Sequence, residues 1–540
     1  MSDAQPRAKS SCTDPRYTAL VRIVAWCLLL GGGCSVGDVD LEGKRCPCVA
    51  GWTCDVTTGL CVRSTVSDAG RRDSSGDRDA GMPSTDAGAP TDGGAERDAS
   101  SGDDGGTTPD AGGADAGPLR VSHRWSRIFG TRGTSRGRGV AVDSAGNAYV
   151  AGNYDGTPDF GGGPLTNAGS DDIFVASFDS AGSHRWSMGF GSTAQEFGHA
   201  IALDEAAGRV YVAGACGGIT FGSTTLVNRG DRDACVGSLR TSDGAPMWAV
   251  SIGSSANDQA QAVAVGGGGA VYVSGFVGGP TTIASVPLAH AGMEDVFVAR
   301  LDSDGSERWG RTYGSAMHDS ASALAAGVDG VYVAGSMGGA VDFGGGTLAH
   351  AGQFDAYVLA LTTDGVHRWS TSFGGADYDE VYGIAVDDAQ AVITGYVGDG
   401  VDLGGGPLAG GILVASFSTG GAHRWSMGPG AGYGLAIDHD ASGILVVAGA
   451  LGGTADFGGG ALTSAGMDDG FVVAMTPGGA HRASVAFGGT EADVASGVAV
   501  APGGYVAIAG GLASTADLGG GVLVPSSPAD ILAAGLTLGP

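Results

Sequence analysis

Four cysteines lie close together near the N-terminus, at Cys46, Cys48, Cys54 and Cys61. Thiols at such a spacing can form two disulfides or bind a zinc ion. Four cysteines allow three connectivities, and all three stay open. Zinc is the less favoured alternative, because a single residue separates Cys46 from Cys48, which is not the usual spacing of a zinc knuckle. We therefore expect a disulfide framework without metal.

Two further cysteines, Cys216 and Cys235, replace apolar residues of a repeated pattern. The equivalent residues of other repeats are Tyr154, Val277 and Met337 for the first position, and Phe174, Phe297 and Tyr357 for the second. Both cysteines are expected on adjacent antiparallel strands, so the pair predicts a disulfide in an exported protein. Two buried free thiols are the alternative.

Histidines and acidic turns also recur, but their spacing does not predict a catalytic or metal site. The histidines that precede an arginine fall in five different repeats, as His123, His184, His367, His423 and His481. The Asp-Ser-Asp-Gly turn at 302–305 lacks the closing glutamate of a calcium loop. No Gly-x-Ser-x-Gly, His-Glu-x-x-His or Walker pattern occurs. The sequence thus predicts no metal, no cofactor and no enzymatic activity.

The elements that must position these residues are seven copies of a motif of about sixty residues, which run from residue 121 to the end. Each copy contains an aromatic strand, a small-residue strand, a turn, a second strand, a long glycine-rich loop and a third strand. The aromatic position holds Trp125, Trp186, Trp248, Trp309, Trp369 and Trp425, with Ala483 in the seventh place. Four strands per copy predict one propeller blade. Because the last copy ends without an aromatic strand, the N-terminal strand is expected to complete the last blade.

One stretch carries a family resemblance: Phe129-Gly130, followed by Gly-Val-Ala-Val-Asp-Ser-Ala-Gly-Asn-Ala-Tyr-Val-Ala-Gly at 139–152. It resembles the bacterial seven-bladed beta-propeller repeat family (SBBP), and the resemblance extends over all seven copies. It implies an all-β fold, a seven-bladed β-propeller with four-stranded blades. Asn147 is replaced in the other copies, and the sixth copy loses most of its acidic loop at 428–433. Most members of this family have no assigned reaction, so the resemblance implies a scaffold or a binding surface.

Residues 1–33 have the pattern of an export signal, in which Arg16 and Arg22 precede an apolar run at 23–30 and three glycines. Small residues before Cys34 resemble a bacterial lipobox, although Gly31 stands where that family usually has leucine. The resemblance implies that Cys34 is acylated, which would anchor the protein to the outer membrane or cell surface. A secreted or periplasmic protein is the alternative. Residues 34–63 then form a cysteine-rich module, which resembles short modules of bacterial surface lipoproteins.

Composition separates the rest of the chain into a linker and a ring. Residues 64–119 are rich in Asp, Ala, Gly, Ser, Thr and Pro and predict a disordered acidic linker, while 120–540 form the propeller. The chain has 28 Lys and Arg against 57 Asp and Glu, a net charge of −29, and no lysine after Lys44. Nucleic acid is excluded as a partner because phosphate binding needs a basic patch. We expect a monomer.

The loops after Phe-Gly and the long glycine-rich loops should share one face, because successive antiparallel strands reverse direction. The polar residues of the first set differ between blades, from Arg132, Arg136 and Arg138 to Gln195, Glu196 and His199. One blade has both loops shortened, which predicts a recess there. The binding-face candidates at this blade are Tyr378, Asp379, Glu380, Tyr382 and Tyr433.

Together these features predict a non-catalytic cell-surface lipoprotein that presents a propeller to a protein or a glycan. The alternative is a propeller enzyme, either one that acts on glycans or a quinone-dependent oxidoreductase. The strands expected beside the axis, such as Gly-Val-Ala-Val at 139–142, favour the first hypothesis. They offer small residues where catalytic groups would have to converge.

Overall fold

The computed structural model describes residues 52–55, 60–63, 119–130, 133 and 135–539, which fall into two units divided at Gly112. In the first unit, β1 (Trp52–Asp55) pairs antiparallel with β2 (Leu60–Arg63). The export signal, the linker and the residues Cys34, Cys46 and Cys48 lie outside the described residues, as do the side chains of Cys54 and Cys61.

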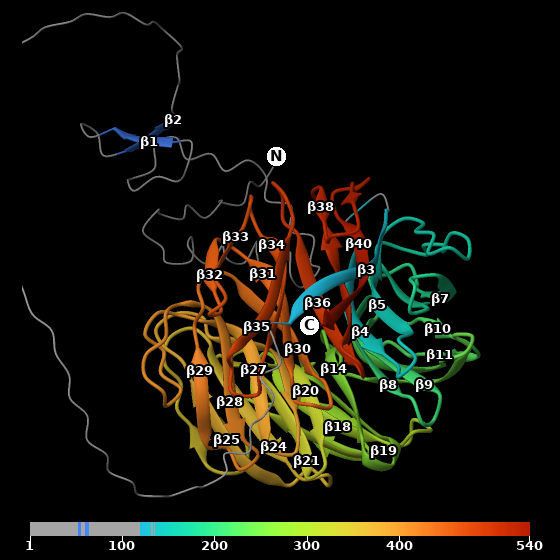
Figure 1. Cartoon of the computed structure of the whole chain (residues 1–540). Helices are drawn as coiled ribbons and strands as arrows, with labels where there is room; N and C mark the ends of the chain where they lie inside the picture. The colour runs from blue at the N-terminus through green and yellow to red at the C-terminus, as the bar shows by residue number, and fades with distance from the viewer. Residues whose placement is uncertain (1–51, 56–59, 64–118, 131–132, 134, 540) are drawn as a thin grey trace, which may run out of the picture. The chain divides into compact units, whose positions relative to one another are not determined.

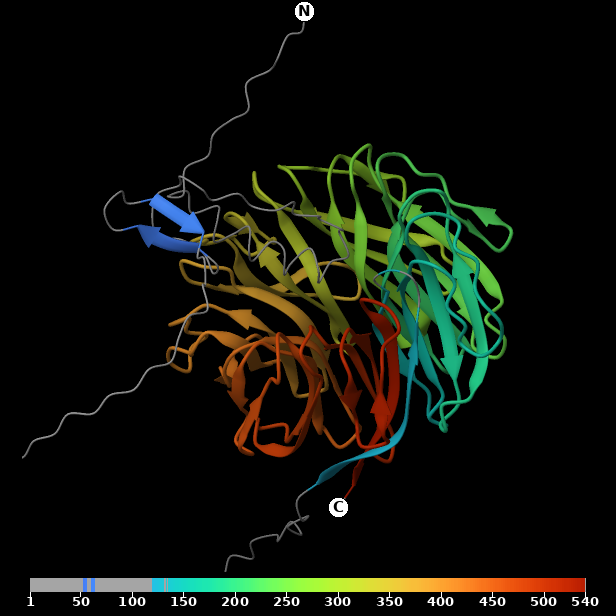
Figure 2. The same ribbon diagram turned by 90° about the horizontal axis from the view of Figure 1, so that it is seen from above.

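The second unit contains, in its described residues, seven four-stranded antiparallel sheets that follow one another around a ring (Figures 1 and 2). Blade 1 contains, from first strand to last, β4 (Arg136–Val142), β5 (Ala148–Tyr154), β6 (Asp172–Phe178) and β7 (His184–Phe190). Blade 2 contains β8 (Phe197–Asp204), β9 (Arg209–Cys216), β12 (Asp233–Arg240) and β13 (Pro246–Ile252). Blade 3 contains β14 (Gln259–Gly266), β15 (Ala270–Val277), β18 (Asp295–Leu301) and β19 (Glu307–Tyr313). Blade 4 contains β20 (Asp319–Gly327), β21 (Gly330–Met337), β24 (Asp355–Leu361) and β25 (His367–Phe373). Blade 5 contains β26 (Glu380–Val386), β27 (Gln390–Val397), β28 (Gly411–Ser418) and β29 (His423–Met427). Blade 6 contains β30 (Tyr433–His439), β31 (Leu445–Leu451), β34 (Asp469–Met475) and β35 (His481–Phe487). Blade 7 contains β36 (Val494–Ala501), β37 (Tyr505–Leu512), β40 (Asp530–Gly539) and β3 (Arg120–Phe129).

The first strand of each blade lies nearest the ring axis, because it packs beside the first strands of both neighbouring blades. The N-terminal strand β3 is the outermost strand of blade 7 and pairs with β40 from Arg120 opposite Gly539 to Phe129 opposite Ile531 (Figure 1). The prediction that the N-terminal strand completes the last blade is therefore confirmed, as is the seven-bladed all-β fold.

The hydrophobic core lies between blades. Each apolar cluster joins two successive sheets, and the cluster between blades 7 and 1 joins Trp125 and Ala507 to Phe178 and Tyr154. An equivalent cluster between blades 1 and 2 joins Trp186 to residues of both sheets. A blade that buries its faces only against its neighbours is stable only when both neighbours are present.

The tryptophans hold successive blades together. The indole N–H of Trp186 donates to the carbonyl oxygen of Thr241, in the tight turn of the next blade, at 2.9 Å. A Cβ on Gly244 of the same turn would lie 2.5 Å from the Trp186 ring. Equivalent bonds join the tryptophans of blades 2 to 5 to the turns that follow, as Trp248 to Ser303, Trp309 to Thr363, Trp369 to Thr419 and Trp425 to Pro477. These contacts give the tryptophans a structural role between blades.

Ala483 of β35 occupies the tryptophan position of blade 6. The turn that a tryptophan would contact in blade 7 is missing, because β40 and β3 come from opposite ends of the chain. The alanine thus stands at the one seam of the ring.

Short hairpins fill most of the long glycine-rich loops. Those described are β10 (Thr220–Phe221) with β11 (Thr224–Thr225), β16 (Thr281–Ile283) with β17 (Val286–Leu288), β22 (Val341–Asp342) with β23 (Thr347–Leu348), β32 (Thr454–Asp456) with β33 (Ala461–Thr463), and β38 (Ala516–Asp517) with β39 (Val522–Leu523). Within the described ranges, none of the helical segments has the length and hydropathy needed to cross a membrane.

Candidate functional site

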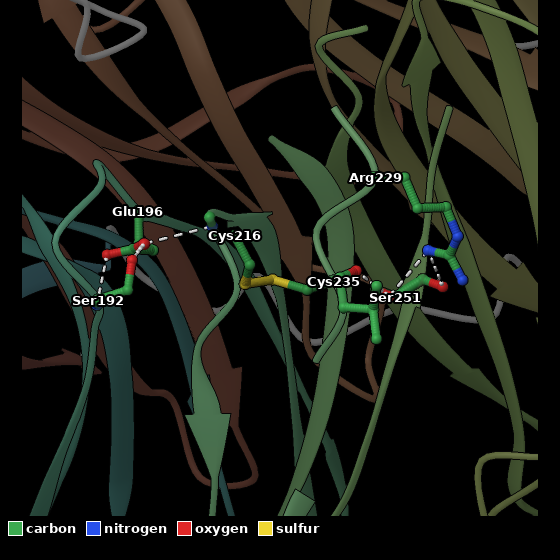
Figure 3. The surroundings of a disulfide bond; sticks show 8 residues. Ser192, Glu196, Cys216, Arg229, Cys235 and Ser251 are labelled. Carbon is green, nitrogen blue, oxygen red and sulfur yellow. Dashed lines mark hydrogen bonds between the residues drawn. A yellow bond between two sulfur atoms is a disulfide. The ribbon is translucent and has the colours of Figure 1, made fainter. Parts of the chain in front are cut away.

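Cys216 and Cys235 form a disulfide between β9 and β12 of blade 2, with Cα atoms 5.9 Å apart (Figure 3). The prediction from the repeat register is confirmed. The bridge closes a loop of 19 residues, for which chain entropy predicts a stabilisation of about 3 kcal/mol. Cys235 also borders an apolar cavity of about 10 Å³ between blades 1 and 2, which is far smaller than a ligand pocket.

Buried carboxylates hold the loops after Phe-Gly. Asp379 is fully buried, and its two oxygens accept hydrogen bonds from the backbone N–H groups of Gly375 (2.7 Å) and Gly398 (2.8 Å). Burial raises the pKa of Asp379, while these two hydrogen bonds lower it. The same pair of backbone bonds is made by Glu196, Asp258, Asp319 and Asp493. Asp379 is thus part of the repeated frame, and its expected position at the border of an open recess is wrong.

The five recurring histidines also belong to the frame. The Nε2 atom of each lies 3.0 to 3.2 Å from the hydroxyl of the serine three residues later. The ring of His184 also faces Gly161 and Gly162 of the loop above it. Among the residues that the structure describes, no group of three or more His, Cys, Asp or Glu could hold a metal ion.

Near the ring axis, a β-bulge recurs in the first strand of every blade. The bulged residues differ between blades, unlike the carboxylates and histidines that repeat as part of the frame. The first strand of every blade shifts register near its start, so that one residue falls outside the pairing, with a second, Ala321, in blade 4. The bulged residues are Arg138, His199, Gln261, Ser322, Tyr382, Leu435 and Ser496. All seven are partly exposed. Bulges re-aim side chains and are common beside binding sites.

We define the axial belt as these seven residues together with the residue two positions before each, namely Arg136, Phe197, Gln259, Ser320, Glu380, Tyr433 and Val494. Contacts within the belt run from one blade to the next. His199 Nε2 lies 3.2 Å from Gln259 Oε1, and the Ser320 hydroxyl donates to Gln261 Oε1 at 2.7 Å. These two contacts link blades 2, 3 and 4, and elsewhere the belt also contains the apolar residues Phe197, Leu435 and Val494. The small residues expected beside the axis, such as Gly-Val-Ala-Val at 139–142, follow the bulged residue on the same strand.

Blade 1 supplies the cationic part of the belt, Arg136 and Arg138, and blade 2 places Phe197 and His199 beside it. Arg138 donates from Nε to Asn153 Oδ1 at 3.0 Å, and its guanidinium lies 5.8 Å from the centre of the Phe197 ring. Burial and the like charge of Arg136 lower the pKa of Arg138 to about 10, against the attraction of Asp171. Burial and the charge of Arg138 also lower the pKa of His199 to about 3, so this imidazole is neutral at pH 7.

Blades 5 and 6 supply an aromatic part. The Tyr382 hydroxyl donates to the Glu380 carboxylate, and Tyr433 stacks on Tyr396 with ring centres 5.2 Å apart. Burial and the negative charge of Glu380 raise the pKa of Tyr382, which stays neutral at pH 7. Three of the predicted binding-face residues, Glu380, Tyr382 and Tyr433, therefore lie together in the axial belt.

Tyr378 lies outside the axial belt and stacks on Phe354 of the same face, with ring centres 5.6 Å apart. The two short loops of this region meet each other, since the Ile412 N–H donates to Gly430 O at 2.8 Å. Gly430 in turn pairs with Ala455 of the next hairpin. Backbone thus spans the place where the sequence predicted a recess.

His439 is the last residue of β30 and joins the first strands of blades 5 and 6. It does so at the end of these strands that lies away from the axial belt. Its Nδ1 lies 3.1 Å from Asp440 O and its Nε2 lies 3.0 Å from Val386 O. Both partners only accept, so both bonds form only when the imidazole is protonated. Burial lowers the pKa of His439, but the two carbonyls and the carboxylates of Asp438 and Asp387 outweigh it, and the pKa is raised.

This raised pKa predicts a pH-dependent contribution to stability. The contribution is complete below about pH 6.5, the unfolded value, and is lost as the pH rises through the folded pKa. We expect His439→Gln, which is never charged, to lower the free energy of unfolding by on the order of 1 kcal/mol more at pH 5.5 than at pH 9. Urea unfolding of both proteins at the two pH values measures this difference, and an equal loss at both would contradict the protonated state.

Comparison with known proteins agrees with this architecture. Residues 124–157 match the family model of the SBBP beta-propeller repeat. This segment contains most of β3 and all of β4 and β5, and thus runs from blade 7 into blade 1. The chain is a seven-bladed propeller that carries this repeat.

Similar solved structures include the Neurospora crassa Pan2 WD40 domain, at 11% identity and a TM-score of 0.42, over 77% of this chain and 95% of that chain. Another is the quinohemoprotein alcohol dehydrogenase from Comamonas testosteroni, at 10% identity and a TM-score of 0.35, over 77% of this chain and 76% of that chain. No curated protein matches the sequence.

Proposed function

We propose that this chain is a non-catalytic binding protein of the cell envelope, whose axial belt contacts a glycan or protein partner. The observation that carries the proposal is that one backbone feature recurs in all seven blades while its side chain changes. The bulge presents Arg138, Gln261, Tyr382 or Leu435 according to the blade.

Structural positions of this ring behave differently. The carboxylates of Asp258, Asp319 and Asp379 make the same two backbone hydrogen bonds in successive blades, because each blade needs the same support. A position that only filled space beside the axis would be expected to repeat in the same way. Side chains that vary on a rigid, repeated frame are typical of recognition.

An envelope location is supported by the chemistry of blade 2 and by the N-terminal sequence. A disulfide such as Cys216–Cys235 persists in oxidising compartments. The charged and apolar segments before Cys34 have the order of an export signal. We propose that Cys34 carries the lipid, that residues 64–119 act as a tether, and that the protein lies at the outer membrane or cell surface as a monomer.

A matched pair of glutamines tests the proposal. Gln261 lies in the axial belt, whereas Gln353 is exposed in a loop on the same face. We expect Gln261→Ala combined with Tyr433→Ala to weaken binding to the best ligand of a glycan and envelope-protein array by about tenfold or more, with the melting temperature unchanged. Gln353→Ala should leave binding unchanged.

The same preparations serve a screen for glycan hydrolysis and quinone-dependent oxidation. Turnover that depends on the belt residues would contradict a non-catalytic role. Binding that survives the double variant would remove the axial belt as the binding surface.

A further inference from the structure

We infer that three side-chain amides of blade 3 bind the acetamido groups of a saccharide, so that the ligand of the axial belt is an uncharged N-acetylated glycan. This inference rests on the proposed function and names its ligand class. The three amides belong to Asn257, Gln259 and Gln261, which we call the amide row. The inference comes from the direction of the hydrogen bonds that these amides make.

The carbonyl oxygen of every amide in the row already accepts a hydrogen bond. Gln261 Oε1 accepts from the Ser320 hydroxyl at 2.7 Å, and Gln259 Oε1 lies 3.2 Å from His199 Nε2. Because an amide oxygen only accepts, His199 must donate from Nε2. Asn257 Oδ1 accepts from Gln259 Nε2 at 3.5 Å. The oxygens of the amide row are therefore turned toward donors of the protein.

The amide nitrogens are the groups that the row can offer to a ligand. Within the described residues, Gln261 Nε2 and Asn257 Nδ2 have no hydrogen-bond partner, and Gln259 Nε2 uses one of its two N–H groups. All three residues are partly exposed, while Asp258 and Ala260 between them are buried, so the three side chains lie on one side of the chain. A ligand at the amide row thus meets N–H donors.

Hydrogen-bond acceptors lie on the blade 2 side of the same junction. Gln195 donates from Nε2 to the carboxylate of Asp171 at 2.8 Å, which leaves Gln195 Oε1 as an acceptor. His199 is neutral and donates from Nε2 to Gln259, which leaves its Nδ1 as an acceptor. The junction between blades 2 and 3 therefore combines donors on one side with acceptors on the other.

An acetamido group matches this polarity better than a hydroxyl group or a peptide strand does. Its amide is trans, so the carbonyl and the N–H point in opposite directions, and the carbonyl can face the amide row alone. A hydroxyl group carries its own proton on the accepting atom, and that proton needs a further acceptor. An extended peptide presents the N–H and C=O of one residue on the same edge, so its N–H groups would meet the donors of the row.

A carboxylate ligand also accepts, but the charges at this junction disfavour it. Asp258 and Asp319 each accept backbone hydrogen bonds at both oxygens, which stabilises their ionised form. Arg232, whose backbone pairs with Asn257, has the carboxylate of Asp231 at 3.9 Å. A negatively charged ligand would therefore meet more negative than positive groups, whereas an acetamido carbonyl is neutral.

The test uses the full chain with tetra-N-acetylchitotetraose, cellotetraose and N-acetylated tetraalanine amide in titration calorimetry. The two tetrasaccharides have the same backbone and differ only in the acetamido group that replaces one hydroxyl group of each sugar. We expect the N-acetylated saccharide to bind at least about tenfold more tightly than cellotetraose, because it supplies acceptors without an added proton at the same atom.

Gln261→Glu is the decisive variant, because a carboxylate still accepts from Ser320 but has no N–H to donate. We expect it to weaken binding of the N-acetylated saccharide by about tenfold. Gln353→Glu makes the same chemical change in an exposed loop on the same face and should leave the affinity unchanged. Asn257→Asp also keeps the accepting oxygen and removes the donors, and it replaces Gln261→Glu if that variant fails to fold.

Several results would overturn the inference. They are equal affinity for the two tetrasaccharides, no binding of the N-acetylated one, tighter binding of the tetraalanine, or an unchanged affinity in both Gln261→Glu and Asn257→Asp. If the array instead gives a glycan without acetamido groups whose binding needs Gln261 and Tyr433, the proposed function stands and only the N-acetylated ligand is wrong.

Discussion

A chain that begins at residue 131 is expected to aggregate or to lose most of its stability. It would lack β3, which pairs with β40 along its whole length and contributes the buried side chains of Trp125 and Phe129. Truncating a buried Trp or Phe costs about 3–5 kcal/mol each, against a total stability of about 5–15 kcal/mol for most domains. Strand β40 would also become an exposed edge, which favours association with other chains.

A chain that begins at residue 119 is the control, since it lacks the linker but keeps β3. Thermal unfolding and light scattering of both chains measure the effect. A chain from 131 that stays monomeric and melts at the same temperature would show that blade 7 is stable with three strands.

Trp186→Ala is expected to destabilise the ring by about 3–5 kcal/mol. Trp186 is 5% exposed, packs with Tyr149 and holds the turn of the next blade through Thr241. Trp186→Phe keeps most of the packing and loses one hydrogen bond, so we expect a loss closer to 1 kcal/mol from the bond itself. Denaturant unfolding of the three proteins separates the two contributions.

Gly244→Ala probes the same contact from the other side. Gly244 has φ +70° and faces the Trp186 ring, so a methyl group there is strained by the backbone and by the indole. An unchanged stability in Gly244→Ala, or equal losses in the Phe and Ala variants of Trp186, would contradict the contact between this turn and the tryptophan.

The architecture of this protein could be predicted because it repeats. The number of copies of the motif predicts the number of blades. The aromatic strand before residue 130, which the last copy lacks, predicts that the N-terminal strand closes the ring. The pair Cys216–Cys235 was visible because both residues depart from the repeat on neighbouring strands. In each case the prediction required only that equivalent positions have equivalent surroundings.

The axial belt was missed because a bulge breaks that rule locally. One extra residue shifts the alternation of a strand, and Arg138 lies between Gly137 and Gly139, which favoured a loop. The opposite error concerns Glu196 and Asp379, for which the sequence predicted a place among the variable polar residues of the binding face, whereas both belong to the same repeated frame as Asp258. Each of these acids comes four positions after the residue whose backbone N–H donates to it. This constant spacing was the sign in the sequence that the acids have a structural role.

The seam at blade 7 has a consequence for how the ring could be cut. Arg120 lies opposite Gly539, so a short hairpin turn could join these two residues and make the backbone circular. New ends could then be opened at any existing turn, such as the one that contains Gly182. In such a circular permutant blade 7 would gain the turn that it lacks, and Ala483→Trp would place an indole opposite it. Ala483 and the missing turn of blade 7 would then be the features that mark where the natural chain ends lie. The other blades would be equivalent places for the new ends.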